Sequence, residues 1–169
     1  EAIGREKAGI FRTKTPAIIS DPNPPQSLLL SATDKGANIF CINKDYGYKR
    51  QTTTWNWFAG DQQINQLPEP GLKGEHQYRN ASAAILAVQM LAENLPVSNS
   101  SFRNGLKNTH LLGRFQLIND KIPILLDVGH NEDGIKEILK NIEITPHQNL
   151  LMVIGMVKDK EVEKVLALL

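Results

Sequence analysis

Apolar residues recur along this chain in short blocks, and their spacing predicts alternating strands and helices. In the first part, residues 15–20 form a short strand candidate that a proline-rich turn follows. Residues 27–35 have helical spacing, with apolar residues on one stripe and Gly36 as the predicted stop. The chain therefore begins with a strand and a helix of modest length.

Residues 37–67 have the pattern of β-strands. In TTTWNWF, Trp55 and Trp57 share one face of a strand, while Asn56 points the other way. The sequence AGDQQ, residues 59–63, predicts the turn of a hairpin. We expect a small sheet here, with the tryptophans on its buried face.

A long helix is predicted over residues 80–95, after a loop that is rich in proline and glycine. A shorter helix is predicted over residues 98–106. The apolar stripe of the long helix consists of Ala81, Ala84, Ile85, Val88, Leu91 and Leu95. Alanine dominates its first turns, so another group can approach this end of the helix closely.

The last third of the chain alternates strand and helix patterns. Residues 122–128 and 149–155 are apolar runs typical of buried strands, and helices are predicted over 133–142 and 160–169. Strands that are apolar on both faces, each followed by a helix, indicate a parallel sheet of an α/β fold. We place a domain boundary between residues 109 and 113.

Composition narrows the class of protein. The 169 residues are 41% hydrophobic and 22% charged, as in a globular protein, and the net charge of +1 gives no electrostatic case for nucleic acid or an anionic membrane. The single cysteine, Cys41, excludes an intrachain disulfide framework and a multi-cysteine zinc site, so the cytoplasm is the simplest setting. The sequence lacks an initiator methionine and a signal peptide, and we expect it to be a piece of a longer protein.

The first candidate site is the end of the strand in IPILLDVGHNEDG, residues 122–134. Ligands of open parallel sheets bind outside the carboxyl ends of the strands. Asp127 is near such an end, where a carboxylate can accept hydrogen bonds from ribose hydroxyls, and His130 and Asn131 follow in the same loop. The alternative, which the pattern alone favours, is that Asp127 and Asn131 cap the next helix.

Other candidates lie in loops and at predicted helix ends. Arg114 could bind phosphate oxygens in a forked geometry, although a lone arginine is usually a surface residue. Lys158 could reach a phosphate and Asp159 could cap a helix, with a solvated loop as the favoured alternative. Lys7 stands in a basic segment and is, by pattern, a solvated charge.

The segment GEHQYRNA places amide side chains at a predicted helix start. His76, Gln77 and Asn80 could bond an adenine edge, and capping is the more ordinary role for Asn80. The sequence contains no phosphate-binding loop of the form G-x-x-x-x-G-K-[ST]. The chain therefore holds no self-sufficient nucleoside triphosphate site.

Several stretches, taken together and in order, resemble one family. IGREKAGIFR, LKGEHQYRNASAA, GRFQL with ILLDVGHN, and VIGMVKDKE are similar to the bifunctional dihydrofolate synthase/folylpolyglutamate synthases of the Mur ligase superfamily. The resemblance implies an α/β fold: residues 1–110 as the end of the central, P-loop ATPase domain with a small β-sheet, and residues 111–169 as the first half of a Rossmann-like C-terminal domain. The phosphate loop would precede residue 1.

The family's activity is ATP-dependent ligation of L-glutamate to dihydropteroate or folate through an acyl phosphate, in folate biosynthesis. The resemblance implies ATP and Mg²⁺ as cofactors, Lys7 as a carbamylated catalytic lysine that helps to hold the metal, and His130 as a second catalytic residue. It further implies ATP contacts by Asn80, Arg114 and Asp127, with Asp127 on the ribose.

The resemblance leaves alternatives. A peptidoglycan Mur-type amino-acid ligase shares the architecture, and a non-catalytic nucleotide-binding module could be built from the same fold. For the ligase we expect small-molecule substrates, no nucleic acid and no membrane, a cytoplasmic monomer as the full-length protein, and no activity of this piece alone.

Overall fold

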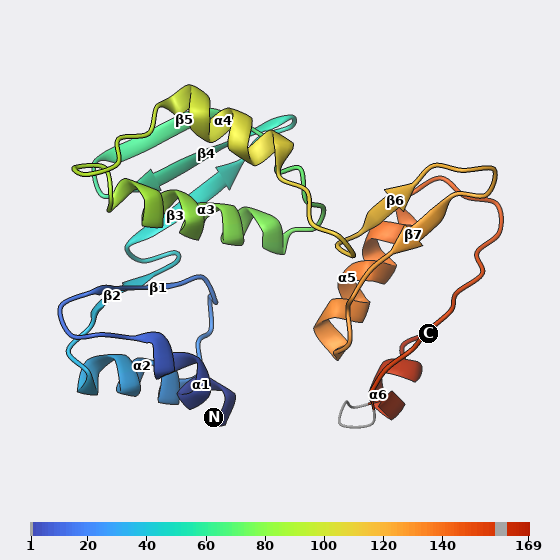
Figure 1. Cartoon of the computed structure of the whole chain (residues 1–169), viewed down its shortest axis with the longest axis horizontal. Coiled ribbons are helices and arrows are strands. Elements are labelled where there is room, and N and C mark those ends of the chain that lie inside the picture. The colour runs from blue at the N-terminus through green and yellow to red at the C-terminus, as the bar shows by residue number, and fades with distance from the viewer. Residues whose placement is uncertain (1, 158–161) are drawn as a thin grey trace. The chain divides into compact units, whose positions relative to one another are not determined.

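The computed structural model describes residues 2–157 and 162–169, which form two compact units. Unit 1 contains the residues up to Gly71 together with Glu75–Thr109, and unit 2 contains Leu72–Gly74 together with the residues from His110 onward. Figure 1 shows unit 1 in blue to yellow and unit 2 mainly in orange and red. The assignment of residues 1–110 and 111–169 to particular ligase domains stays a prediction.

The first part of unit 1 is a small α/β layer. Its elements are α1 (Ala2–Lys7), the 3₁₀ turn η1 (Ala8–Ile10), β1 (Pro16–Ile19), α2 (Gln26–Asp34) and β2 (Asn38–Cys41). β1 and β2 pair in parallel, as expected for strands that a helix connects. Ala8, Ala17 and Ala32 are buried together with Phe11, so small side chains let the helices lie close to the strands. The predicted strand at 15–20 and helix at 27–35 are confirmed.

The second part of unit 1 is an antiparallel sheet. Its strands are β3 (Tyr46–Arg50), β4 (Thr54–Ala59) and β5 (Gln62–Pro68), in the order β3-β4-β5. The β4–β5 turn contains Gly60 with φ of +54°, a conformation that favours glycine. Trp55 and Trp57 are both fully buried, which confirms that they share the core face. The segment around residue 40, by contrast, pairs with β1 rather than joining this sheet.

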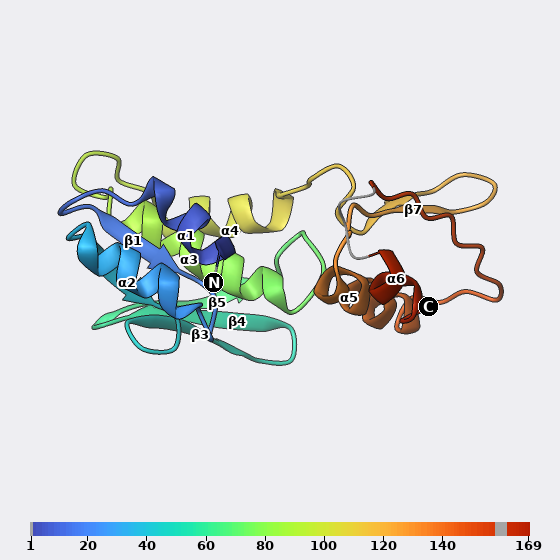
Figure 2. The same cartoon turned by 90° about the horizontal axis from the view of Figure 1, so that it is seen from below.

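Helix α3 (His76–Gln89) covers one face of this sheet (Figure 2). The Trp57 indole Nε1 donates to the Ser82 carbonyl oxygen at 3.0 Å and so ties β4 to the helix. The predicted stripe is partly wrong, because Ala84 is exposed while Ser82 and Leu86 are buried. The face of α3 that contains Ser82 packs against Trp57 of the sheet, so Ala84 lies on the solvent-facing side of the helix.

The predicted limits of this helix also need correction. The helix begins at His76 rather than at residue 80, and it ends at Gln89, so that Leu91 and Leu95 are exposed. Helix α4 (Asn99–Asn108) agrees with the prediction, and the Ser98 side chain caps it by accepting from the Ser101 N–H at 3.1 Å. Arg103 donates to the Asn65 carbonyl oxygen at 2.7 Å, which holds α4 against β5.

Unit 2 contains a two-stranded hairpin and two helices. Its elements are β6 (Gln116–Ile118), β7 (Ile124–Leu126), α5 (Glu132–Glu143) and α6 (Val162–Leu166), and β6 pairs with β7 in antiparallel register. Ile135 and Ile142 of α5 and Val165 of α6 are buried, and α5 confirms the helix predicted over 133–142. Within the described residues, no helix is long and apolar enough to cross a membrane.

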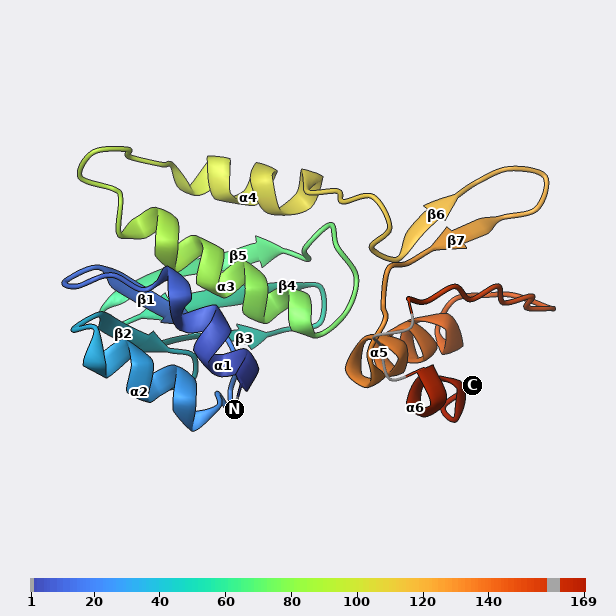
Figure 3. The same ribbon diagram turned by 60° about the horizontal axis from the view of Figure 1, so that its bottom comes forward.

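One predicted strand of unit 2 is wrong. Residues 149–157 follow α5 as an extended segment without a ladder partner in the described part of the chain (Figure 3), and Leu151 and Val153 are each 90% exposed. Among the described residues, the predicted parallel pairing with residues 122–128 is therefore not found, and β7 pairs with β6 alone. The mixed α/β class itself is confirmed. The helix predicted over 160–169 is described only from Val162.

Candidate functional site

The Asp127 carboxylate organises the loop at the end of β7. Its Oδ2 accepts from the backbone N–H of Phe115 at 2.7 Å, and its Oδ1 accepts from the backbone N–H of Gly129 at 2.7 Å. A third bond runs from the Val128 N–H to the Gly113 carbonyl oxygen at 2.9 Å. Hydrogen bonds to an ionised acceptor are stronger than neutral ones. The carboxylate thus fastens the segment before β6 to the segment after β7.

The backbone before β6 has the left-handed conformation at two places. Gly113 has φ of +66° and Phe115 has φ of +45°. A Cβ on Gly113 would also lie 2.7 Å from the Val128 Cγ1, so glycine is required there for space as well as for conformation. The bond from Phe115 to Asp127 stabilises the strained residue, and it places the peptide of Arg114 directly beside the carboxylate.

Arg114 and His130 lie in the same loop cluster as Asp127. The Arg114 side chain is exposed, so its guanidinium can reach a ligand at this end of the hairpin. The His130 Nδ1 lies 3.0 Å from the Val128 carbonyl oxygen. A carbonyl only accepts, so Nδ1 is the donor of this bond and Nε2 is the ring nitrogen that stays outside it. Unit 2 therefore brings one cation, one anion and one imidazole together.

The predicted helix cap is confirmed for Asn131 and wrong for Asp127. Asn131 is the N-cap of α5, and its Oδ1 accepts from the Gly134 N–H at 2.8 Å. Asp127 instead makes the two loop bonds described above. A carboxylate offers about four lone-pair positions, so the two bonds leave acceptor capacity on both oxygens. The ribose role of Asp127 stays a prediction.

In unit 1, Asn80 lies about one turn into α3 rather than at its cap. Its side chain is exposed, and its Nδ2 donates to the Gln77 Oε1 at 3.2 Å. Gln77 is only 7% exposed, and its Nε2 lies 2.9 Å from the His76 Nε2. The capping role suggested for Asn80 is wrong, because the helix begins earlier, after Glu75.

The start of α3 is held by residues that the sequence analysis missed. Glu75 pairs with Arg50 of β3 and accepts a hydrogen bond from the Tyr48 hydroxyl at 3.1 Å. The Arg50 guanidinium lies 4.5 Å from the centre of the Tyr78 ring, and burial raises the pKa of the Tyr78 phenol. These contacts depend on pairing between distant segments. A weak sequence signal is the period-two spacing of Tyr46, Tyr48 and Arg50 in YGYKR, which places them on one face of a strand.

Lys7 is the last residue of α1, and its side chain is 71% exposed. Its Nζ lies 3.8 Å from the Glu6 Oε1, which is a surface ion pair. The described residues contain no cluster of three or more His, Cys, Asp or Glu that could hold a metal ion. The Lys7 amine could supply oxygen ligands to a magnesium ion only after carbamylation.

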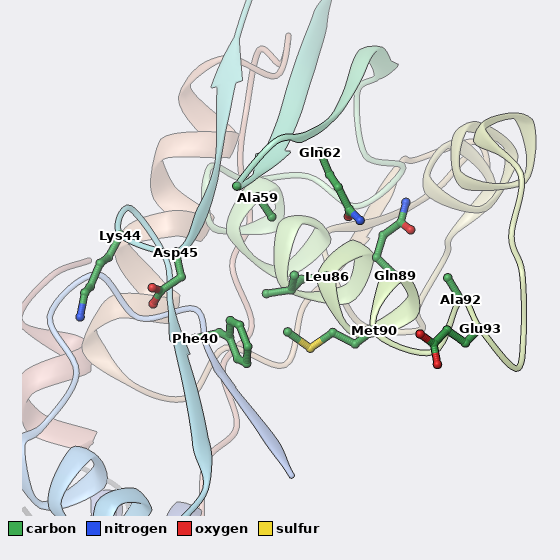
Figure 4. Close-up of a pocket in the computed structure, with 11 residues that line it drawn as sticks. Phe40, Lys44, Asp45, Ala59, Gln62, Leu86, Gln89, Met90, Ala92 and Glu93 are labelled. Atoms are coloured by element: carbon green, nitrogen blue, oxygen red, sulfur yellow. The ribbon is translucent and has the colours of Figure 1, made fainter. Parts of the chain in front are cut away.

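A pocket in unit 1 lies away from the predicted residues (Figure 4). It is found at the end of α3 opposite Gln77 and Asn80, where Leu86 and Met90 face Phe40 of β2. None of the predicted site residues lines this pocket.

The structure thus groups the predicted residues by unit. Arg114, Asp127 and His130 share one loop cluster of unit 2, whereas Lys7 and Asn80 belong to separate helices of unit 1. Lys158 and Asp159 lie outside the described residues.

Comparison with known proteins identifies relatives for both units. Residues 113–169 match the family described as "Mur ligase, glutamate ligase domain". The chain is 32% identical over 168 residues to the dihydrofolate synthase/folylpolyglutamate synthase of Escherichia coli, a match that covers 99% of this chain and 38% of that protein. The Bacillus subtilis protein of the same name is 31% identical over 171 residues, covering 95% of this chain and 39% of the relative.

Solved structures agree with these sequence matches. The E. coli FolC structure "in complex with DHPP and ADP" has a TM-score of 0.85 at 32% identity, and covers 98% of this chain and 39% of that one. A bifunctional folylpolyglutamate synthase/dihydrofolate synthase "with Mn, AMPPNP and L-Glutamate bound" has a TM-score of 0.86 at 31% identity, with 98% and 39% covered. The resemblance expected from the sequence is confirmed, and the chain spans about two fifths of the length of these relatives.

Proposed function

We propose that this chain is part of an ATP-dependent ligase that adds L-glutamate to dihydropteroate, to folate, or to both. The observation that carries the proposal is the similarity across nearly the whole chain, in sequence and in fold, to dihydrofolate synthase/folylpolyglutamate synthases. Relatives of this kind have been solved with ADP, and with AMPPNP, Mn and L-glutamate. The match to these relatives runs through both units in the same order along the chain, which supports a reaction in common with them rather than the likeness of a single fold element.

The proposed reaction proceeds through an acyl phosphate. The substrate carboxylate attacks the γ-phosphorus of ATP, and ADP leaves. The amino group of L-glutamate then attacks the acyl carbon, loses a proton, and phosphate leaves as the amide forms. Both steps gather negative charge at one place, so the protein must supply cations and oriented donors.

Unit 2 supplies groups suited to the nucleotide. Asp127 has acceptor capacity for ribose hydroxyls. Arg114, whose peptide adjoins the Asp127 carboxylate, presents an exposed guanidinium that suits phosphate oxygens. His130 directly follows Gly129, whose N–H donates to Asp127, and its Nε2 lies outside the bond that Nδ1 makes, so the ring could bind or hold a proton near the reacting groups. In unit 1, Asn80 presents an exposed amide suited to the nucleobase.

Lys7 enters the proposal as a carbamate. Carbon dioxide adds to the neutral amine with loss of a proton, which converts a cation into an anion with two oxygens. Such oxygens suit magnesium, which would neutralise phosphate charge when bound. The exposure of the Lys7 side chain leaves its amine accessible to this modification.

The test uses the full-length gene product that carries this sequence. Phosphate release is measured with ATP and L-glutamate, with dihydropteroate, a reduced folate and a peptidoglycan precursor offered separately. Turnover with either acceptor supports the proposal. Turnover only with a peptidoglycan precursor would favour the Mur-type alternative, and nucleotide binding without turnover would favour a non-catalytic module.

Lys7→Ala sharpens the same assay. The variant is expected to lose nearly all turnover, with partial recovery when short carboxylic acids are added. Lys49→Ala, which removes an exposed lysine of β3, is the matched control and should remain active. Normal activity of Lys7→Ala would remove this residue from the site.

A further inference from the structure

We infer that Gln77 is a positioning residue that fixes the amide of Asn80 and thereby makes the protein select adenine over guanine. The inference rests on the proposed function, because it assigns Asn80 to the nucleobase of ATP. What it adds is how the protein distinguishes ATP from GTP by the nucleobase.

The first step is the burial and bonding of Gln77. Its side chain is 7% exposed, in contrast to the exposed Asn80 one turn later. Both ends of the Gln77 amide are engaged: Oε1 accepts from the Asn80 Nδ2 at 3.2 Å, and Nε2 lies 2.9 Å from the His76 Nε2. A buried amide with both ends bonded has a fixed orientation.

The second step is the direction of the bonds. The Gln77 Nε2 only donates, so the His76 Nε2 is the acceptor of this bond. The Gln77 oxygen must then face Asn80, where it needs a donor. Asn80 therefore turns its Nδ2 towards Gln77 and commits one N–H to it. Its second N–H and its Oδ1 point elsewhere.

The third step is what this amide can recognise. Adenine presents the N7 acceptor beside the N6 amino donor, and an asparagine amide matches both with one N–H and its oxygen. Guanine presents two acceptors, N7 and O6, so the asparagine oxygen would oppose O6. A freely rotating Asn80 could reduce this conflict by turning its amide. The bond to Gln77 opposes such a turn.

Reversing Asn80 would have to spread along the helix start. Its Oδ1 would then face the Gln77 Oε1, and two acceptors would meet. Turning Gln77 as well would bring Oε1 against the His76 Nε2, which would have to gain a proton in order to donate. Three side chains must change together, so Asn80 cannot reverse its amide alone to suit guanine.

The experiment compares ATP with GTP as phosphoryl donor in the full-length gene product. Gln77→Met keeps the length of the side chain and removes the acceptor, whereas Gln77→Glu keeps an acceptor for Asn80. Gln89→Met, at the other end of the same helix, is the matched control. The readout is the ratio of kcat/KM for ATP to that for GTP, with melting temperatures recorded to verify folding.

We expect Gln77→Met to lower this ratio by about tenfold, the order of discrimination that one bidentate base contact provides. The loss should arise mainly through KM for ATP, with kcat at saturating ATP little changed. Gln77→Glu should retain most of the ratio, and Gln89→Met all of it. A second variant, His76→Ala, removes the acceptor of the Gln77 Nε2 and lets the Gln77 amide turn. It should lower the ratio of kcat/KM values by a smaller factor, and it keeps the inference testable if Gln77→Met does not fold.

The outcomes separate the inference from the proposal beneath it. An active wild type whose ATP preference survives in the folded Gln77 and His76 variants overturns the inference alone. A wild type without glutamate-dependent ATP turnover overturns the proposed function and the inference with it.

Discussion

The two units use similar apolar sequences with opposite results. In unit 1, Trp55, Trp57 and Leu67 are fully excluded from solvent. In unit 2, Leu151 and Val153 are 90% exposed, although they stand in a run that is at least as apolar. The difference lies in partners: β4 is paired on both sides, whereas residues 149–157 have no ladder partner among the described residues. An apolar run can be buried, but whether it is buried depends on the strands and helices that the rest of the chain places against it.

Among substitutions that test this comparison, the largest loss of folding stability is expected at Trp57. Trp57→Ala should lower the free energy of unfolding by about 3–5 kcal/mol, because it leaves a cavity and removes the indole bond to the Ser82 carbonyl oxygen. Urea unfolding followed by circular dichroism measures it. Phe58→Ala on the opposite face, where the side chain is 44% exposed, should cost less than about 1 kcal/mol. Equal losses would mean that unit 1 is not built around the tryptophan face.

A smaller effect is expected at Asp127. Asp127→Ala removes both loop bonds and should cost about 2 kcal/mol locally, since hydrogen bonds to charged groups contribute about 1.5–3 kcal/mol and this loop is partly exposed. Amide hydrogen exchange at Phe115 and Gly129 should become faster. In the full-length gene product, the KM for ATP should also rise sharply.

The conservative variant separates the two roles of Asp127. Asp127→Asn keeps one oxygen acceptor and should give intermediate exchange rates at the two amides. An unchanged KM for ATP in Asp127→Ala, alongside faster exchange, would assign the residue to the loop and remove it from the nucleotide.

The smallest effect is expected at Leu151. Leu151→Ser in the 169-residue chain should change the free energy of unfolding by no more than about 0.5 kcal/mol, as for other exposed positions. The measurement is the same urea titration as for Trp57→Ala. A loss of several kcal/mol would show that this segment packs in solution and would remove the contrast between the units.

The local parts of the fold could be predicted from the sequence. Helix α5 was predicted within a residue at each end, because Asn131 caps it and isoleucines repeat on one face. The shared face of Trp55 and Trp57 followed from the twofold strand period. The partner of β7 could not be predicted this way, since an apolar strand carries no label for parallel or antiparallel pairing.

The candidate site divides in the same manner. Asp127, Arg114 and His130 could be singled out because a polar cluster interrupts an apolar pattern. The tie between Asp127 and the Phe115 N–H could not, because it joins residues that become neighbours only through the hairpin. The Gln77 and Asn80 pairing was hidden for another reason: the helix begins earlier than the pattern indicated, which moved Asn80 from a cap to the helix surface.

Both tryptophans of the chain lie in β4, within the interior of unit 1. Their intrinsic fluorescence will consequently register the unfolding of that unit. A fluorescence transition that precedes or follows the loss of helical signal would show the two units melting as separate cooperative bodies.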